Sequence, residues 1–119
     1  MDWQLDKKRP LCPQICEQIC VRIACGTLAP GEKLISVREL AVEAGVNPNT
    51  VQHSFEQLEQ EGILYSVRGL GWFVDSDISA AKQTLQRLIR EKTESYFAAM
   101  GALGLNAEET KNYVKEWNG

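Results

Sequence analysis

The sequence predicts a mainly α-helical fold with a small β wing: a winged helix-turn-helix followed by a C-terminal helical hairpin. Three features indicate this class. Two capped amphipathic helices lie between Ser36 and Gly62, joined by only three residues. Two short apolar runs around a glycine-rich loop follow at 63–74, and two further amphipathic patterns occupy 76–119. We therefore expect one folded domain at 1–75 and a two-helix tail at 76–119.

The composition fits one small domain with an extension. The chain has 119 residues, and 44% of them are apolar, which is enough to support a core. It contains no apolar run long enough to span a bilayer. The N-terminal sequence MDWQLDKKRP lacks the apolar stretch of a signal peptide, so we expect a cytoplasmic protein with no membrane partner.

A first helix is predicted over 11–25, because isoleucine recurs every four residues at 15, 19 and 23 and Gly26 follows. After it, Pro30-Gly31 has the pattern of a type II turn. We expect the segment 26–34 to lead into the next helix through a short strand that can join the wing.

All four cysteines lie on this first helix, at 12, 16, 20 and 25. Because free cysteine buries readily as a small hydrophobic residue, we expect the first three to widen the apolar face. Zinc needs four converging ligands, whereas one straight helix offers two at i and i+4. Disulfides within the helix are disfavoured, since i and i+4 Cα atoms sit near the upper distance limit. A redox or thiol–metal sensor stays open if a dimer brings two such helices together.

The central pair of helices has well-marked boundaries. Ser36 and Glu39 match a capping box, and Gly45 supplies a stop. Asn47 is a good N-cap, and Pro48 falls at the first helical position, where its missing N–H costs nothing. Because the connection is so short, the two helices must cross steeply, as in a helix-turn-helix.

The second helix of this pair presents polar side chains to solvent. An apolar stripe at 51, 55 and 58 turns inward, which leaves outside Pro48, Asn49, Gln52, His53 and Glu56. Asn and Gln offer the paired donor and acceptor that match adenine in the major groove. Thr50 could bind a phosphate or touch a thymine methyl, and His53 could reach a phosphate or a base. An ordinary solvated helix face is the alternative.

A hairpin follows this helix directly. Apolar runs at 63–67 and 72–74 flank Arg68-Gly69-Leu70-Gly71, a pattern typical of two strands joined by a tight loop. A hairpin after a helix-turn-helix is the wing of a winged helix. Arg68, at its tip, could contact a phosphate or enter the minor groove, whose negative potential favours arginine.

These residues resemble a known family. The motifs S-V-R-E-L-A, G-V-N-P-N-T-V, L-E-x-E-G and R-G-x-G-x-F-V, in this order, are similar to those of GntR-type transcriptional regulators. The N-P-N-T-V-Q form and the short tail resemble the YtrA subfamily. The resemblance runs from Leu5 to Val74 and implies a DNA-binding domain at 1–75. The candidate DNA-binding residues are Ser36, Arg38, Asn47, Asn49, Thr50, Gln52, His53, Arg68, Gly69 and Gly71.

The resemblance also implies individual roles and shows three departures. Arg38 would grip the phosphate backbone from the middle helix. Ile35 replaces a usual Pro, and Leu70 and Trp72 replace the usual Lys and Thr of the wing. These departures bear on the wing contacts and leave the fold intact.

The charge balance runs against a DNA-binding domain, which is expected to be basic. Residues 1–75 hold seven Lys or Arg and ten Asp or Glu, a net charge of −3. The charges segregate, because Glu56, Glu59 and Glu61 lie towards the end of the recognition helix. Few basic contacts imply modest affinity per protomer and a shallow salt dependence, so dimerisation would be needed. The basic cluster at 7–9 is expected to be a solvated tail, with a DNA-contacting arm as the alternative.

The tail at 76–119 has the pattern of two amphipathic helices. Asp75-Ser76-Asp77 caps a long helix, which Gly101 and Gly104 are expected to break, and Asn106 with Glu109 starts a last short one. Such faces need a partner surface, and an antiparallel hairpin packed on its two-fold mate is the simplest solution. Packing back on the winged helix is the alternative. The candidate dimerisation residues are Leu85, Leu88, Tyr96, Tyr113 and Trp117.

The pattern predicts a regulator rather than an enzyme. The sequence shows no nucleophile–histidine arrangement, no phosphate-binding glycine loop and no metal cluster, so we expect no catalytic residue, metal or cofactor. We expect a homodimeric, sequence-specific repressor on a palindromic double-stranded operator, with an unidentified small-molecule effector left open. The alternatives are a winged helix used as a protein-interaction module and a cysteine-based redox- or metal-responsive regulator.

Overall fold

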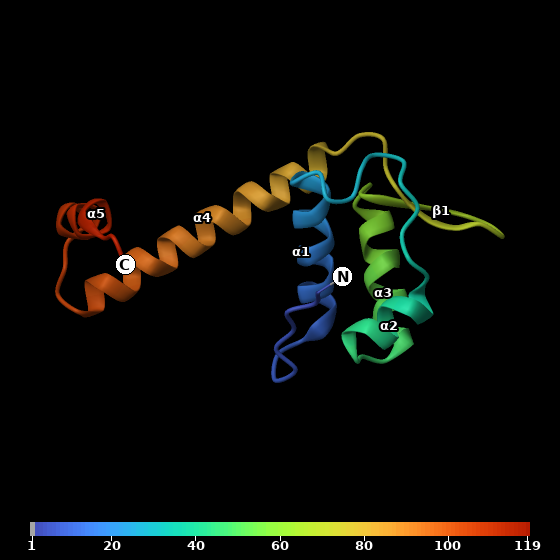
Figure 1. The fold of residues 1–119 in the computed structure, drawn as a ribbon, viewed down its shortest axis with the longest axis horizontal. Coiled ribbons are helices and arrows are strands. Elements are labelled where there is room, and N and C mark those ends of the chain that lie inside the picture. The colour runs from blue at the N-terminus through green and yellow to red at the C-terminus, as the bar shows by residue number, and fades with distance from the viewer. Residues whose placement is uncertain (1) are drawn as a thin grey trace. The chain divides into compact units, whose positions relative to one another are not determined.

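The computed structural model describes residues 2–119 and confirms the mainly helical fold with a small wing (Figure 1). The elements in chain order are α1 (Leu11–Ala24), α2 (Val37–Ala44), α3 (Pro48–Gln60), β1 (Leu64–Val67), β2 (Gly71–Val74), α4 (Ser79–Ala102) and α5 (Ala107–Glu116). The chain forms two compact units, one ending at Leu85 and the other comprising Gln86–Gly119. No helix within residues 2–119 combines the length and apolar character needed to cross a membrane.

The core of the first unit lies between α1, α3 and the base of the hairpin. It contains the predicted isoleucine stripe of α1 and the inward stripe of α3, all fully buried: Ile15, Ile19, Ile23, Val51, Phe55 and Leu58. The Phe55 ring packs edge-on against Trp72 of β2, with the ring centroids 5.5 Å apart. Burial of this continuous apolar cluster is what fixes the polar face of α3 outward.

The helix-turn-helix has the predicted caps. Ser36 Oγ accepts from the Glu39 N–H at 3.1 Å, and Glu39 Oε1 accepts from the Ser36 N–H at 3.3 Å, which completes the capping box. Gly45 ends α2 in the left-handed region, at φ +67°, where a side chain would be strained. Asn47 Oδ1 accepts from the Asn49 N–H at 2.8 Å and so caps α3.

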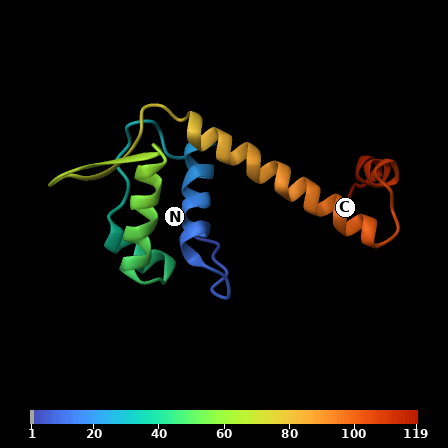
Figure 2. The same ribbon diagram turned by 180° about the vertical axis from the view of Figure 1, so that it is seen from behind.

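The wing is an antiparallel pair in which Leu64 faces Val74 and Val67 faces Gly71. The segment before α2 joins its edge as predicted, because the Leu34 N–H donates to the Trp72 carbonyl at 2.9 Å. The buried ends of the strands anchor the hairpin, and in both views its tip projects away from the helices (Figures 1 and 2). The tip is therefore free to contact another molecule.

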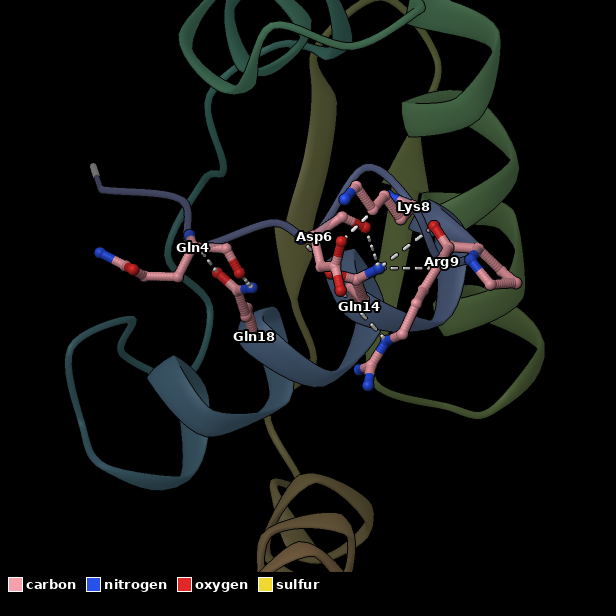
Figure 3. Close-up of polar contacts among 7 residues, drawn as sticks. Gln4, Asp6, Lys8, Arg9, Gln14 and Gln18 are labelled. Carbon is pink, nitrogen blue, oxygen red and sulfur yellow. Dashed lines mark hydrogen bonds and ion pairs between the residues drawn. The ribbon is translucent and has the colours of Figure 1, made fainter.

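The segment before α1 is held against that helix, although the basic cluster at 7–9 is exposed as predicted. Gln4 and Gln18 exchange hydrogen bonds: the Gln4 N–H donates to Gln18 Oε1 at 3.2 Å, and Gln18 Nε2 donates to the Gln4 carbonyl at 2.8 Å. The amide group of Gln14 accepts from the Asp6 N–H and donates to the Asp6 carbonyl (Figure 3). Two glutamines of α1 thus hold the segment along the helix.

This N-terminal segment also reaches α2. Trp3 stacks under the Arg22 guanidinium at 4.0 Å, and its Nε1 donates to Glu43 Oε1 at 3.3 Å. Lys7 Nζ donates to the Gly45 carbonyl at 2.8 Å, at the turn of the helix-turn-helix. The segment therefore links α1 to the end of α2.

In the second unit, the long helix continues further than the sequence indicated. Gly101 lies inside α4, which corrects its assignment as a break, and only Gly104, at φ +95°, follows the helix end. Asn106 and Glu109 form the predicted capping box of α5. Thr110 is buried and donates from Oγ1 to the Asn106 carbonyl at 2.8 Å, which tightens the first turn of α5.

Candidate nucleic-acid interface

The first two turns of α3 form an exposed polar surface. Asn49 and His53 are exposed, and Thr50 and Gln52 are half-buried. The side-chain oxygen of Asn47 accepts the capping hydrogen bond of α3, which leaves its NH₂ group as a donor. The surface thus carries amide, hydroxyl and imidazole groups at the end of the helix where unpaired backbone N–H groups add positive potential.

Gln52 is restrained in the unbound protein. Its Nε2 donates to Glu56 Oε2, one turn further along α3, at 3.2 Å. The amide must leave this carboxylate before it can pair with a base edge. Glu56 therefore competes with any ligand of Gln52 and places a negative charge on the same face.

Two arginines flank this surface. Arg38 lies exposed on the first turn of α2, beside the exposed Ser36 cap, and Arg68 lies exposed at the wing tip. Neither forms an ion pair within residues 2–119. Both guanidinium groups are therefore free to bind phosphate oxygens in a bidentate way.

The wing tip needs glycine at two positions. The Leu70 N–H donates to the Val67 carbonyl at 2.9 Å, and Gly69 at the third position of this turn has φ +83°. Gly71 has φ +116°, and a Cβ there would lie 3.3 Å from Lys33 Cε. The glycines shape the tip that carries Arg68, rather than supplying chemistry themselves.

One contact in this region was not predicted from the sequence, although the basic cluster at 7–9 had a DNA-contacting arm as its alternative interpretation. Lys7 lies at the turn between α2 and α3 through its bond to the Gly45 carbonyl. The two residues are 38 positions apart, so no local periodicity indicates the contact. A basic cluster directly before a predicted helix is the only signal that could have suggested it.

The predicted dimerisation residues fall into two groups. Tyr96, Tyr113 and Trp117 line one open apolar groove of about 840 Å³ between α4 and α5 of the second unit. Leu85 and Leu88 are half-buried on α4 and are not among the residues lining that groove. The structure thus brings together three of the five.

The fold and this surface define a winged helix-turn-helix protein. The chain belongs to the gntR family of bacterial regulatory proteins, whose family model matches residues 12–74. This assignment confirms the resemblance seen in the motifs and makes the chain a regulatory protein rather than an enzyme.

Two relatives match along most of their length. The uncharacterized HTH-type transcriptional regulator YhcF of Bacillus subtilis (strain 168) is 37% identical over 115 residues, which cover 97% of this chain and 95% of that protein. The HTH-type transcriptional repressor YtrA of the same organism is 34% identical over 111 residues, covering 90% of this chain and 83% of that protein. The similarity therefore includes the tail as well as the winged helix.

Solved structures agree. A GntR family transcriptional regulator from Listeria monocytogenes matches with a TM-score of 0.82 at 36% identity, covering 96% of this chain and 100% of that chain. The DNA-binding domain of AraR in complex with operator ORX1 matches with a TM-score of 0.54 at 32% identity, covering 62% of this chain and 90% of that chain.

Proposed function

We propose that this protein is a homodimeric transcriptional repressor that binds a two-fold symmetric operator. Residues 1–75 would bind DNA, and residues 76–119 would hold the dimer together. The observation that carries the proposal is the exposed polar surface of α3 flanked by two unpaired arginines. The similarity to the operator-bound AraR domain supports DNA as the partner, and the similarity to the repressor YtrA supports repression.

In the proposed complex the first turns of α3 enter the major groove. Asn49 and Gln52 would pair with adenine N6 and N7, because their amide groups match that donor and acceptor pattern. Thr50 and His53 would contact the adjacent sugar-phosphate edge, and Asn47 would donate its remaining NH₂ to a phosphate. These contacts supply the sequence specificity, since base edges distinguish one site from another.

The flanking groups would set the register. Arg38 and the Ser36 hydroxyl would bind the phosphate backbone from α2, and Arg68 would bind it from the wing. Gly69 and Gly71 would let the wing tip approach the backbone closely. The few cations of this face would give each protomer modest affinity, so that two linked protomers are required on one operator.

The second unit supports dimerisation. It leaves large apolar side chains in water, with Leu103 78% exposed, Trp117 66% and Tyr113 57%. Single surface apolar residues are normal, but a continuous aromatic groove marks an interaction site. A second copy would cover this groove and the Leu85–Leu88 stretch of α4.

DNA binding can be tested by selecting bound sites from random duplex DNA. The native chain is expected to enrich an inverted repeat, and the Arg38→Ala, Gln52→Ala double variant is expected to enrich none. Because both substitutions are at exposed or half-exposed positions, the variant should keep the native fold. A thermal unfolding curve that matches that of the native chain checks this. If the native chain enriches no motif even at low salt, the proposal is contradicted. A protein partner is then favoured, which would agree with the acidic charge balance of residues 1–75.

Dimerisation can be tested separately by light scattering on a size-exclusion column. Tyr113→Glu places a charge in the groove and is expected to convert the native dimer into a monomer. Asn112→Glu adds the same charge to an exposed neighbouring position outside the groove lining and is the matched control. A native monomer at tens of micromolar, or equal behaviour of both variants, contradicts the assigned interface.

A further inference from the structure

Two thiols lie together where α1 packs against α3. Cys12 and Cys16 are one turn apart on α1, and both are partly buried. The Cys16 S–H donates to the Ser54 carbonyl of α3, with 3.5 Å between sulfur and oxygen. Burial raises the pKa of Cys16 far above its ordinary value, and the adjacent Cys12 thiol raises it further. Cys16 is therefore in contact with the proposed recognition helix, and an ion that binds its sulfur must displace the proton.

The spacing of this pair suits a bridging ion better than a disulfide. Residues at i and i+4 of a helix have Cβ atoms about 5–6 Å apart, whereas a disulfide needs about 3.5–4.5 Å. Oxidation to a disulfide would thus have to unwind α1. If the metal–sulfur bonds are about as long as the 2.3 Å of zinc thiolates, a cation held linearly by two thiolates spans about 4.6 Å between the sulfur atoms and can bridge one helical turn.

The number of ligands selects the class of ion. No group of three or more His, Cys, Asp or Glu side chains in residues 2–119 is arranged to hold a metal ion. Zinc needs four ligands, so this site does not suit it. Soft thiolates select Cu(I), a monovalent cation that two sulfur ligands can satisfy.

We propose that Cys12 and Cys16 form a two-thiolate binding site for Cu(I). Two S–H bonds break and two S–Cu bonds form, both protons leave to solvent, and no oxidation state changes. The site thereby goes from neutral to a net charge of −1. Cys20, which is 2% exposed among the core isoleucines, is not required.

Ion binding at this position would weaken DNA binding, an effect that rests on the proposed function. The Cys16 S–H bond to the Ser54 carbonyl is lost, so one contact between α1 and α3 is replaced by a larger, negatively charged group. That charge adds to a chain already at −3 and repels the phosphates that α3 approaches. Cu(I) would then release the protein from its operator.

The site is tested by anaerobic titration of the full chain with Cu(I) against a coloured Cu(I) chelator. We expect one high-affinity Cu(I) per protomer, and Cys12→Ser and Cys16→Ser should each weaken binding by more than about 100-fold. Serine at position 16 keeps a donor for the Ser54 carbonyl, and circular dichroism confirms that each variant is folded. Cys25→Ser removes an exposed thiol outside the pair and should leave Cu(I) affinity unchanged.

Two results would overturn parts of the proposal, and they are distinguishable. Absence of saturable binding, or equal Cu(I) affinity in Cys16→Ser and Cys25→Ser, overturns the site whatever the chain does to DNA. The effect on DNA is read by fluorescence anisotropy with a selected duplex, where Cu(I) should raise the native Kd several-fold and leave that of Cys16→Ser unchanged. Saturation of the site with no change in the native Kd overturns the regulatory role.

Discussion

Removing the Glu56 carboxylate should tighten operator binding. In the unbound protein Gln52 Nε2 donates to Glu56 Oε2 at 3.2 Å, so the amide proposed to read adenine is held along the helix. Glu56→Ala frees that amide and removes one negative charge from the DNA-facing side. Alanine also keeps the helix propensity, so α3 should remain intact.

The size of the effect follows from these two contributions. An exposed hydrogen-bonded pair at this helical spacing stabilises the unbound form by about 0.2–0.5 kcal/mol. A unit charge about 8 Å from a phosphate contributes about 0.5 kcal/mol of repulsion in water. Together they amount to about 0.7–1 kcal/mol, or about three- to fivefold tighter binding.

The chain provides a matched control for this experiment. Gln57 Nε2 donates to Glu61 Oε2 at 2.6 Å, which is the same pair of residue types at the same spacing, five residues further along and ending at the C-cap of α3. Glu61→Ala removes an equal charge and the corresponding hydrogen bond, and it should change affinity by less than about twofold because Glu61 lies at the opposite end of α3 from the DNA-facing turns. Anisotropy at fixed salt measures both. Adding Gln52→Ala should abolish the part of the gain that comes from freeing the amide and leave only the part that comes from the lost charge. Equal affinities of the Glu56→Ala and Glu61→Ala variants for the operator would refute the proposed contact between Gln52 and an adenine.

Three further predictions concern other elements. Arg38→Ala should weaken binding to all duplexes alike and make the slope of log K against log salt less negative by about 0.9, measured across a salt series. Gly45→Ala should destabilise the fold by about 1 kcal/mol, because Gly45 has φ +67°. Gly101→Ala should stabilise it by about 0.5–1 kcal/mol, because Gly101 lies inside α4 with open space around it. Thermal melts in which Gly45→Ala is the more stable variant would refute this assignment of backbone conformations. Alkylation with iodoacetamide should label exposed Cys25 long before Cys16, whose raised pKa keeps it a neutral thiol, as peptide mass spectrometry can follow.

Elements governed by local chemistry were predictable from the sequence. The capping box at Ser36 and Glu39, the stop at Gly45 and the cap at Asn47 each depend on residues within four positions of one another. The inward stripe of α3 follows from helical periodicity alone. These signals were sufficient for the winged helix-turn-helix and for the polar surface of α3.

Features that depend on distant residues were not predictable. The bond from Lys7 to Gly45 joins positions far apart, and its geometry exists only after α1 and α2 have packed. Gly101 does not end α4, because a glycine inside a helix lowers its stability by only about 1 kcal/mol, which a helix of 24 residues tolerates. Gly104 follows the end of α4 and has a positive φ, which is incompatible with continuing the helix.

The hydrogen bonds that the candidate site residues make in the unbound protein were only partly predictable. The cap that Asn47 Oδ1 makes on α3 was predicted, whereas the hydrogen bond that holds the Gln52 amide against Glu56 was not. A polar side chain on a helix has several possible partners one turn away or less. The partner to which the side chain forms its hydrogen bond depends on its rotamer, which the sequence does not specify.

In the proposed complex two protomers bind two half-sites of one operator, and the ratio of two Kd values tests this most directly. The Kd of the native chain is measured for the selected inverted repeat and for a duplex in which one half of the repeat is scrambled. We predict that scrambling one half raises the Kd by more than about 100-fold, with two protomers per intact duplex. Equal Kd values for the two duplexes, with one protomer bound to each, would contradict the dimeric operator complex.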